Sequence, residues 1–261
     1  MGSREDTKQR ERTRLSVVIP VFLSEPVLEG VWGELSAVLK SAAYRSEVIF
    51  VDDGSPDGSW EVLKRLCRGN HDVVLLRLRR NHGQSTAICV GVSWARGDLV
   101  GLLDCDLEYP PRELTRLVEA CREPCQVVSG WRRGRSEGAP LRTIASKYLC
   151  TLMSALCRRR LIDPTSPVKV FPRALFTRVI SDRCARAFPQ EFLVLGARVV
   201  TELPIDVDSD NRRSAYGLQR LLERFVSFHA SIAARTCRLS GLTDNGWDPC
   251  ELVEVCIDRR E

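Results

Sequence analysis

Residues 99–118 read LVGLLDCDLEYPPRELTRLV, and this stretch shows the unit from which the fold can be predicted. The apolar run Leu99–Leu103 predicts a strand, which stops at the acidic turn Asp104–Asp106. Pro110 and Pro111 then open a helix, because the first turn of a helix tolerates the missing N–H of proline. One strand, one polar turn and one helix therefore follow each other directly.

The same unit repeats along the first half of the chain. Further apolar runs predict strands at residues 15–22, 47–51, 73–78 and 127–128. Apolar residues at helical spacing predict helices that begin at Ser24, near Val62 and at Ser85. Because strand–helix repeats imply right-handed crossovers, we predict a doubly wound, mostly parallel α/β sheet with flanking helices.

The second half of the chain is less regular. Helices are predicted over residues 141–157, 172–180, 189–196 and 214–235. A loop from residue 163 leads into a short strand ending at 171, and a longer strand is predicted over 198–207. We predict a disordered tail (1–14), one domain (15–236) and a helical C-terminal extension (237–261).

The composition excludes two classes of protein. With 44% hydrophobic and 28% charged residues among 261, the chain resembles globular proteins and not disordered ones. No apolar run approaches the ~18–20 residues of a membrane span. The polar N-terminus lacks the apolar core of a secretory signal, so the protein is expected in the cytoplasm. The amphipathic helix from Ser214 is expected to pack on the core, and peripheral contact with a membrane is the alternative.

The cysteines and arginines each have a simple interpretation. Cytosolic thiols normally stay reduced, so the 11 cysteines are predicted to be small core residues. Cys121 and Cys125 lack the second pair or histidine that a zinc site needs. The cluster Arg158–Arg160 is interpreted as a solvated helix end, and a site for a phosphorylated ligand is the alternative. The net charge of +5 comes without aromatic-interleaved basic stripes, so nucleic acid is not an expected partner.

Ligands of doubly wound sheets bind at the carboxyl ends of the strands. Three polar turns lie at such ends, namely Asp52–Asp53, Asn81–Gln84 and Asp104–Glu108. We therefore expect these turns to converge on one crevice.

Asp104 and Asp106 are candidates for a metal site in that crevice. Two carboxylates one residue apart can both face a hard divalent cation such as Mg²⁺ or Mn²⁺, which prefers oxygen ligands and often keeps a phosphate in its shell. Glu108, at the next alternate position, would complete a carboxylate triplet. A solvated acidic turn is the alternative.

Four stretches resemble family-2 glycosyltransferases with the GT-A fold. They are VVIPVFLSEPVLE (17–29), VIFVDDGSPDGS (48–59), NHGQSTAICVGVSWARGD (81–98) and the stretch 99–118. The polyprenyl-phosphate glycosyltransferases, including dolichol-phosphate mannosyltransferase and its undecaprenyl-phosphate relatives, are especially similar. ASK (145–147) and SAYG (214–217) extend the resemblance. It implies inverting, Mg²⁺- or Mn²⁺-dependent transfer of a sugar from a UDP-, GDP- or dTDP-sugar.

The resemblance also implies roles for individual residues. Those of the nucleotide-sugar site are Pro20, Val21, Glu25, Asp52, Asp53, Gly83, Gln84, Asp104, Cys105 and Asp106. The metal ligands are Asp104, Asp106 and Glu108, the last standing where polyprenyl-phosphate enzymes usually have glutamine. The acceptor or its phosphate is expected to meet Arg132, Arg142, Lys169 and Arg212.

The acceptor side departs most from the pattern of the family. The usual Gly-Phe-Arg is Pro167-Val168-Lys169, and the usual Arg-x-x-Gly-x-Ser-Lys reads Ser209–Ala215 with Arg212 at the glycine position. The family usually has an asparagine early in the first loop, and this chain has Leu23 there. These departures lead us to predict a soluble natural-product hydroxyl or amine as acceptor. The alternatives are a polyprenyl-phosphate acceptor and a non-catalytic subunit that binds nucleotide sugars.

A hydroxyl acceptor requires a general base near the anomeric carbon. Glu191 lies about where GT-A enzymes place this base, and Asp163, which opens the acceptor-side loop, is the rival candidate. The alternative for Glu191 is an exposed glutamate favoured by the helix dipole. The sequence leaves the donor sugar and the formation of a homo-oligomer open.

Overall fold

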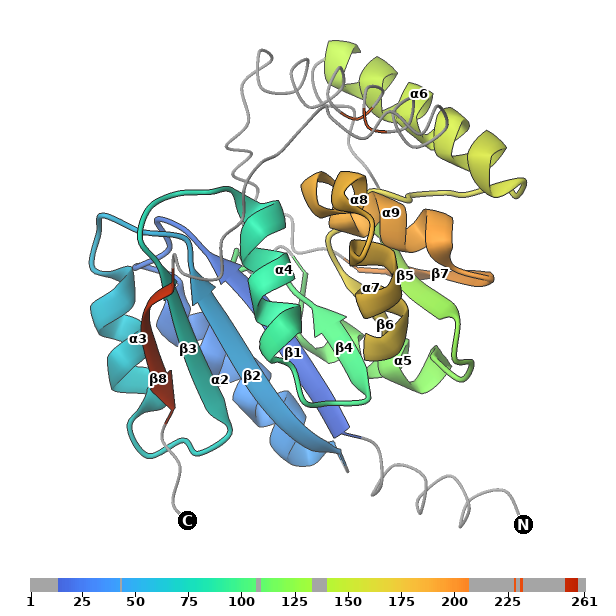
Figure 1. Ribbon diagram of the computed structural model, residues 1–261. Coiled ribbons are helices and arrows are strands. Elements are labelled where there is room, and N and C mark those ends of the chain that lie inside the picture. The colour runs from blue at the N-terminus through green and yellow to red at the C-terminus, as the bar shows by residue number, and fades with distance from the viewer. Residues whose placement is uncertain are drawn as a thin grey trace, which may run out of the picture.

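The computed structural model describes residues 14–42, 44–106, 109–132, 140–206, 228, 231 and 252–257. Its strands are β1 (Arg14–Val21), β2 (Arg45–Asp52), β3 (Val73–Leu78), β4 (Leu99–Leu102), β5 (Gln126–Arg132), β6 (Lys169–Pro172), β7 (Val199–Ile205) and β8 (Leu252–Ile257). They form one sheet in the order β7-β5-β6-β4-β1-β2-β3-β8 (Figure 1). Only β6 and β8 run antiparallel to their neighbours in this sheet, which confirms the predicted mostly parallel α/β architecture.

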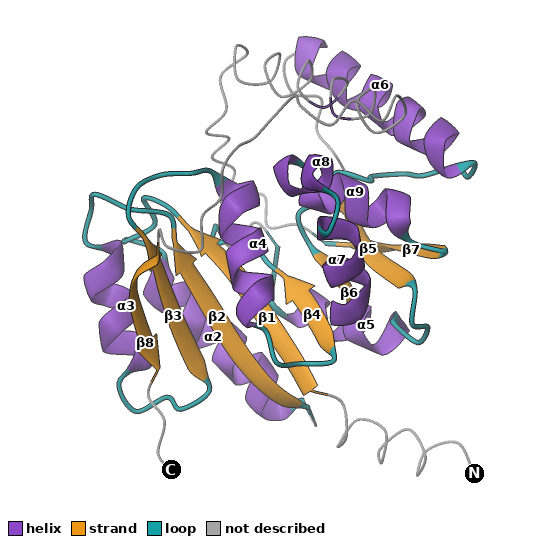
Figure 2. Cartoon of the chain, in the orientation of Figure 1, coloured by secondary structure: helices purple, strands orange, loops and turns teal. Residues whose placement is uncertain are grey.

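Helices cover both faces of the sheet (Figure 2). They are α2 (Leu28–Ser41), α3 (Ser59–Cys67), α4 (Gln84–Trp94), α5 (Arg112–Ala120), α6 (Pro140–Cys157), α7 (Arg173–Ile180), α8 (Arg183–Ala187) and α9 (Pro189–Gly196). Apolar residues of α2, α3 and α5 form one buried cluster, and those of α4, α7 and α9 form another on the opposite face. Strand β1 serves both, because alternate side chains point to opposite faces. None of the described helices is long and apolar enough to cross a membrane.

Local differences from the predicted elements have physical causes. Helix α2 begins at Leu28 and not at Ser24, because residues 24–27 form a turn in which the Val27 N–H donates to the Ser24 carbonyl. The short helix α8 was not predicted, since its five residues, RCARA, carry no periodic pattern. Seven cysteines lie in the described part, all of them as free thiols, and four of these are buried.

The C-terminal extension contributes a strand to the sheet. Leu252–Ile257, where a helical extension was predicted, forms β8 and pairs antiparallel with β3. Its backbone satisfies the N–H and C=O groups of what would otherwise be an open sheet edge. The rest of 237–261, the tail before Arg14 and most of the predicted helix 214–235 lie outside the described residues. Phe228 of that helix is buried against Phe188 and Phe192, as expected if the helix packs on the core.

Gly91 lets α4 lie directly on the sheet. A Cβ at this position would lie 2.4 Å from Val18 Cγ1 and 3.0 Å from Val51 Cγ2, and both valines are fully buried. Gly91→Ala is therefore expected to lower the free energy of unfolding by about 1–3 kcal/mol, because the core must shift to admit a methyl group. Urea denaturation measures this change.

Gly33→Ala in α2 is the matched control. No atom outside its own helix and its chain neighbours lies within 4 Å of a Cβ built at Gly33. Since alanine favours helix over glycine, this variant is expected to gain up to about 1 kcal/mol. Equal changes in the two variants would contradict the close packing of α4.

Candidate active site

The predicted polar turns come together at one edge of the sheet. The parallel registers place Val21 beside Asp52 and Asp52 beside Arg77, so the ends of β1, β2 and β3 are level. Leu103, just after β4, donates its N–H to the carbonyl of Val18 in β1. The loops after these four strands therefore line the same end of the molecule, as expected for a ligand crevice.

Asp53 joins the loop after β2 to the loop after β3. Its Oδ1 and Oδ2 accept the backbone N–H groups of His82 and Gly83, each at 2.8 Å. Burial raises the pKa of Asp53, and these two hydrogen bonds oppose that rise. Gly83 has a φ of +90°, a conformation that glycine adopts without strain. Asp53 thus shapes the crevice, and its contact with a nucleobase stays a prediction.

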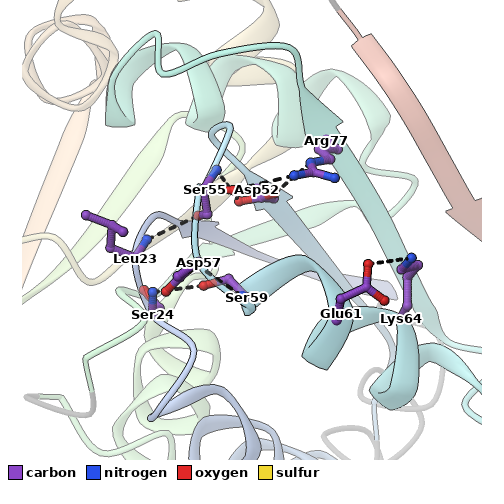
Figure 3. A network of polar contacts seen from close by, with 9 residues as sticks. All are labelled: Leu23, Ser24, Asp52, Ser55, Asp57, Ser59, Glu61, Lys64 and Arg77. Atoms are coloured by element: carbon purple, nitrogen blue, oxygen red, sulfur yellow. Dashed lines mark hydrogen bonds and ion pairs between the residues drawn. The ribbon is translucent and has the colours of Figure 1, made fainter.

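Asp52 faces inward beside it. Its side chain is fully buried, Oδ1 accepts the Ser55 N–H at 3.0 Å, and Oδ2 lies 3.2 Å from Nε of Arg77 (Figure 3). Burial raises the pKa of Asp52 despite its hydrogen bonds with Ser55 and the nearby positive charge of Arg77. Arg77 also stacks over Trp60, 5.3 Å from the ring centroid. These contacts give Asp52 a structural role that the sequence analysis missed.

Side chains of the β2–α3 loop and α3 hold the loop after β1. The backbone N–H of Leu23 donates to Ser55 Oγ at 3.1 Å, and that of Ser24 donates to Ser59 Oγ at 3.0 Å (Figure 3). Glu25, a predicted nucleotide contact, accepts the N–H of Gly58 at 2.9 Å. Leu23 has a φ of +54°, which lies in the left-handed region that asparagine adopts at a lower energetic cost than leucine. The first loop is therefore ordered by its neighbour.

Asp104 and Asp106 follow β4, as predicted. Nε2 of Gln84, the first residue of α4, donates to Asp104 Oδ1 at 2.7 Å and so links two of the predicted donor-binding turns. Cys105 between the aspartates points inward and is only 8% exposed, and burial raises its pKa to about 12. The two aspartates are half-buried at this edge of the sheet.

The carboxylates of Asp104 and Asp106 fit a hard divalent cation. Asp104 and Asp106 supply oxygen ligands, and Mg²⁺ is usually held by one or two carboxylates together with water and substrate phosphates. Within the described ranges no three His, Cys, Asp or Glu residues gather around a common metal position. Glu108, the predicted third carboxylate, lies outside the described residues.

Lys169, which was predicted to meet the acceptor, lies inside the sheet. It is the first residue of β6, is fully buried and pairs with Leu102 at the end of β4 and with Ser129 in β5. Its Nζ donates to the carbonyl of Ser166 and, at 3.4 Å, to Oε1 of Gln190. Lys169 therefore connects the loop before β6 with the first turn of α9.

The surroundings of Lys169 are acidic. Burial lowers its pKa to about 8, and the negative charges of Glu191, Asp163, Asp104 and Glu202 oppose this shift. The structure thus gathers both predicted bases and one predicted metal ligand around a single interior cation. Full burial does not favour direct contact between Lys169 and an acceptor phosphate, which stays a prediction.

The two candidate bases differ in their contacts. Asp163 is 8% exposed, and its Oδ1 accepts the hydroxyl of Thr165 at 2.9 Å. Glu202 of β7 accepts the N–H groups of Ile162 and Asp163, each at 2.7 Å, and so fixes the loop that carries Asp163. Sequence reasoning missed Glu202, although a glutamate within an apolar strand was a signal.

Glu191 lies in the first turn of α9, behind Pro189. A helix N-terminus favours a negative charge, as the alternative interpretation of Glu191 holds. The positive charge of the nearby Lys169 attracts the negative charge of Glu191 as well. Its role as a base stays a prediction.

The remaining predicted acceptor residues are described in part or not at all. Arg132 ends β5 and Arg142 lies in α6, but only the backbone of each is described. Arg212 lies outside the described residues. Pro20 and Val21 end β1 at the edge of the crevice, as predicted.

The fold and the crevice define a glycosyltransferase of the GT-A type. The model of glycosyl transferase family 2 matches residues 16–184, more than half of the chain. The protein therefore belongs to glycosyl transferase family 2 and is an enzyme of that class, which confirms the resemblance seen in the sequence.

Its curated relatives include undecaprenyl-phosphate 4-deoxy-4-formamido-L-arabinose transferases. The chain is 33% identical to that of Aeromonas hydrophila over 228 residues, which are 86% of this chain and 69% of the relative. It is 31% identical to that of Edwardsiella ictaluri over 210 residues, 80% of this chain and 64% of the relative. The chain thus spans about two thirds of the length of these relatives.

Solved structures show the same fold. Glucosyl-3-phosphoglycerate synthase from Mycobacterium tuberculosis has a TM-score of 0.63 at 21% identity, over 90% of this chain and 83% of that one. Mannosyl-3-phosphoglycerate synthase from Rubrobacter xylanophilus has a TM-score of 0.62 at 19% identity, over 97% of this chain and 90% of that one. At these identities the likeness establishes the fold alone.

Proposed function

We propose that this protein transfers a sugar from a nucleotide-sugar donor to a polyprenyl phosphate. The observation that carries the proposal is the similarity to undecaprenyl-phosphate sugar transferases over 86% of the chain. The comparisons favour this alternative over the natural-product acceptor predicted from the sequence, which none of them supports. Because a polyprenyl phosphate resides in a membrane, we expect the protein to work at a membrane surface.

The crevice suits the donor half of this reaction. Asp104 and Asp106 would hold a divalent cation, which when bound neutralises charge on the leaving diphosphate. A solved complex of the mycobacterial synthase contains Mn²⁺ and UDP-glucose, in line with this assignment. Asp53 and Gln84 fix the loop after β3 and the start of α4 through hydrogen bonds. These segments would therefore need little rearrangement when the nucleotide sugar binds.

The acceptor half needs little proton transfer. An oxygen of the acceptor phosphate bonds to the anomeric carbon while the bond from that carbon to the donor diphosphate breaks. The nucleoside diphosphate leaves with the bonding electrons, and the configuration inverts. Because the attacking oxygen is already anionic, a general base is not required.

Transfer assays test the proposal. UDP-, GDP- and dTDP-sugars are each incubated with Mn²⁺ and either undecaprenyl phosphate, undecaprenol or soluble alcohols. We expect sugar to appear on undecaprenyl phosphate and not on the alcohols. Transfer to a soluble alcohol, with none to the lipid phosphate, would restore the natural-product prediction.

Glu191→Gln separates the two acceptor classes further. With a phosphate acceptor, we expect kcat to stay within about threefold of the wild-type value, because no base is needed. With a hydroxyl acceptor, loss of a base would lower kcat by about 10²–10⁴-fold. Steady-state kinetics with each acceptor distinguish the two classes. Asp163→Asn is assayed in parallel, because Asp163 is the rival candidate base. A large loss with the phosphate acceptor and unchanged nucleotide binding would contradict the base-free mechanism.

A further inference from the structure

A pocket of about 460 Å³ lies between α6 and the segment 160–165, here called the α6 pocket. Helix α6 contributes Lys147 and Thr151 to its wall, and the segment contributes Arg160, Ile162 and Asp163. Lys147 belongs to the ASK stretch of the family resemblance, and Arg160 belongs to the cluster for which a phosphate site was the alternative to a solvated helix end. Among these wall residues, only Asp163 was named as a site residue from the sequence.

Its walls are held in place by hydrogen bonds. Ser154 Oγ accepts the N–H of Leu161 at 3.0 Å, and Cys150 Sγ lies 3.1 Å from the Leu161 carbonyl, to which it donates. On the other side, the carboxylate of Glu202 fixes the N–H groups of Ile162 and Asp163. The segment therefore cannot move away from α6 without breaking several contacts.

The charges in the pocket favour an anion. Lys147 and Arg160 are exposed, and no carboxylate of the described residues lies within ion-pair distance of either side chain. They outnumber the one carboxylate of the pocket, Asp163, which also accepts a hydrogen bond from Thr165. An arginine and a lysine that line one pocket can both donate to the oxygens of a phosphate.

Apolar surface accompanies these cations. Ile162 in the pocket wall is 52% exposed, and Tyr148, next to Lys147 in α6, is 46% exposed. Exposed apolar side chains beside two exposed cations suit a ligand with an anionic head and a hydrocarbon tail.

The pocket adjoins the acceptor side of the crevice. Asp163 belongs to both, because it lines the pocket and its charge also acts on Lys169, as does that of Asp104 at the end of β4. Figure 1 shows the chain returning from the end of α6 to β6, the strand next to β4. A phosphate in the pocket is therefore near Asp163, one of the carboxylates whose charge acts on Lys169.

We propose that the α6 pocket binds the head of the polyprenyl phosphate acceptor, with Lys147 and Arg160 on the phosphate and Ile162 on the first isoprene unit. This inference rests on the proposed function, because it names where that acceptor enters. The donor occupies the crevice at the ends of β1 to β4, so the two substrates approach from different elements.

Binding of farnesyl phosphate to the full chain tests the pocket. Calorimetry compares farnesyl phosphate with farnesol and inorganic phosphate for the wild type and for the double variant Lys147→Gln/Arg160→Gln. We expect farnesyl phosphate to bind the wild type most tightly and the double variant to bind it about tenfold more weakly, since two charge-assisted contacts are lost. Nucleotide binding stays unchanged.

Two further variants make the test specific. Arg158→Gln removes the same charge two residues from Arg160 but outside the pocket wall, so its affinity for farnesyl phosphate is expected to stay within twofold of wild type. Thr151→Trp fills the pocket and leaves both cations, and is expected to weaken binding as much as the double variant does. Circular dichroism confirms that each variant is folded.

The outcomes separate this inference from the proposed function. Unchanged farnesyl phosphate affinity and KM in the double variant would overturn the pocket assignment while leaving sugar transfer intact. If the double variant bound phosphatidylglycerol vesicles more weakly but kept its affinity for farnesyl phosphate, the pocket assignment would be wrong. Lys147 and Arg160 would then belong to a membrane-docking surface. Absence of transfer to any lipid phosphate by the wild type would instead contradict the proposed function.

Discussion

Exchanging Asp106 for asparagine is expected to lower the rate of sugar transfer by about 10²–10³-fold and to abolish the effect of Mn²⁺ on nucleotide binding. Asparagine has the size of aspartate but no charge, so the turn after β4 keeps its shape while the cation loses a ligand. The leaving diphosphate then builds up negative charge without a neutralising partner.

Titration calorimetry with UDP, GDP and dTDP, each with and without Mn²⁺, measures the effect on nucleotide binding. The nucleotide that binds best then identifies the donor for transfer assays. Asp98→Asn is the matched control, because this exposed aspartate precedes β4 at the opposite end of the same strand. A variant at Asp106 that still binds its nucleotide in a Mn²⁺-dependent manner would remove this residue from the metal site.

Replacement of Lys169 by methionine is expected to lower kcat by about 10–100-fold, because a small misplacement of groups around a reaction site can cost this much. The ammonium of Lys169 holds the Ser166 carbonyl and Gln190, and it offsets the charges of Asp163 and Glu191. Without it, the loop before β6 and the first turn of α9 lose their common anchor. The acceptor side of the crevice is then misplaced relative to Asp104.

The pH dependence of the wild type follows from the same residue. Burial lowers the pKa of Lys169 to about 8, so transfer is expected to fall as the pH rises through 8 and the ammonium loses its proton. The unfolded chain keeps this proton up to about pH 10.5. Since the unfolded state then binds more protons, the contribution of Lys169 to stability rises between pH 8 and 10.5 while activity declines.

Opposite trends of activity and stability distinguish this effect from unfolding. A pH–rate profile and urea denaturation at pH 7, 8, 9 and 10 record both for the wild type, Lys169→Met and Lys169→Arg. The arginine variant keeps its charge over this range and is expected to lose the alkaline decline. An alkaline decline that persists in Lys169→Met would contradict the assignment to this residue.

The pattern of residues 99–118 and its repeats predicted the sheet well, because burial on both faces leaves a continuous apolar run in the sequence. Strand β3 has the predicted bounds, residues 73–78, and α6 and α9 agree within one residue. Strand β8 was not predicted as a strand, since an edge strand is determined by the partner it meets. That partner, β3, lies more than 170 residues away in the chain.

The sequence alone determined which polar residues lie at the strand ends. Asp53, Gln84, Asp104 and Asp106 follow apolar strands, and a parallel sheet brings all such turns to one edge for purely geometric reasons. It could not determine the partners of those side chains. That Asp52 faces Arg77, or that Asp53 caps two backbone N–H groups, depends on distances between strands that no local pattern encodes.

Only the tertiary structure decided the environment of Lys169 and the α6 pocket. In the sequence, Lys169 is a cation at the start of a short strand, and Glu202 is a glutamate in another. Their charges meet, together with those of Asp163 and Glu191, because β6 lies between β4 and β5 while α9 begins beside it. The pKa of a group depends on burial and neighbouring charge, and both are properties of the folded chain.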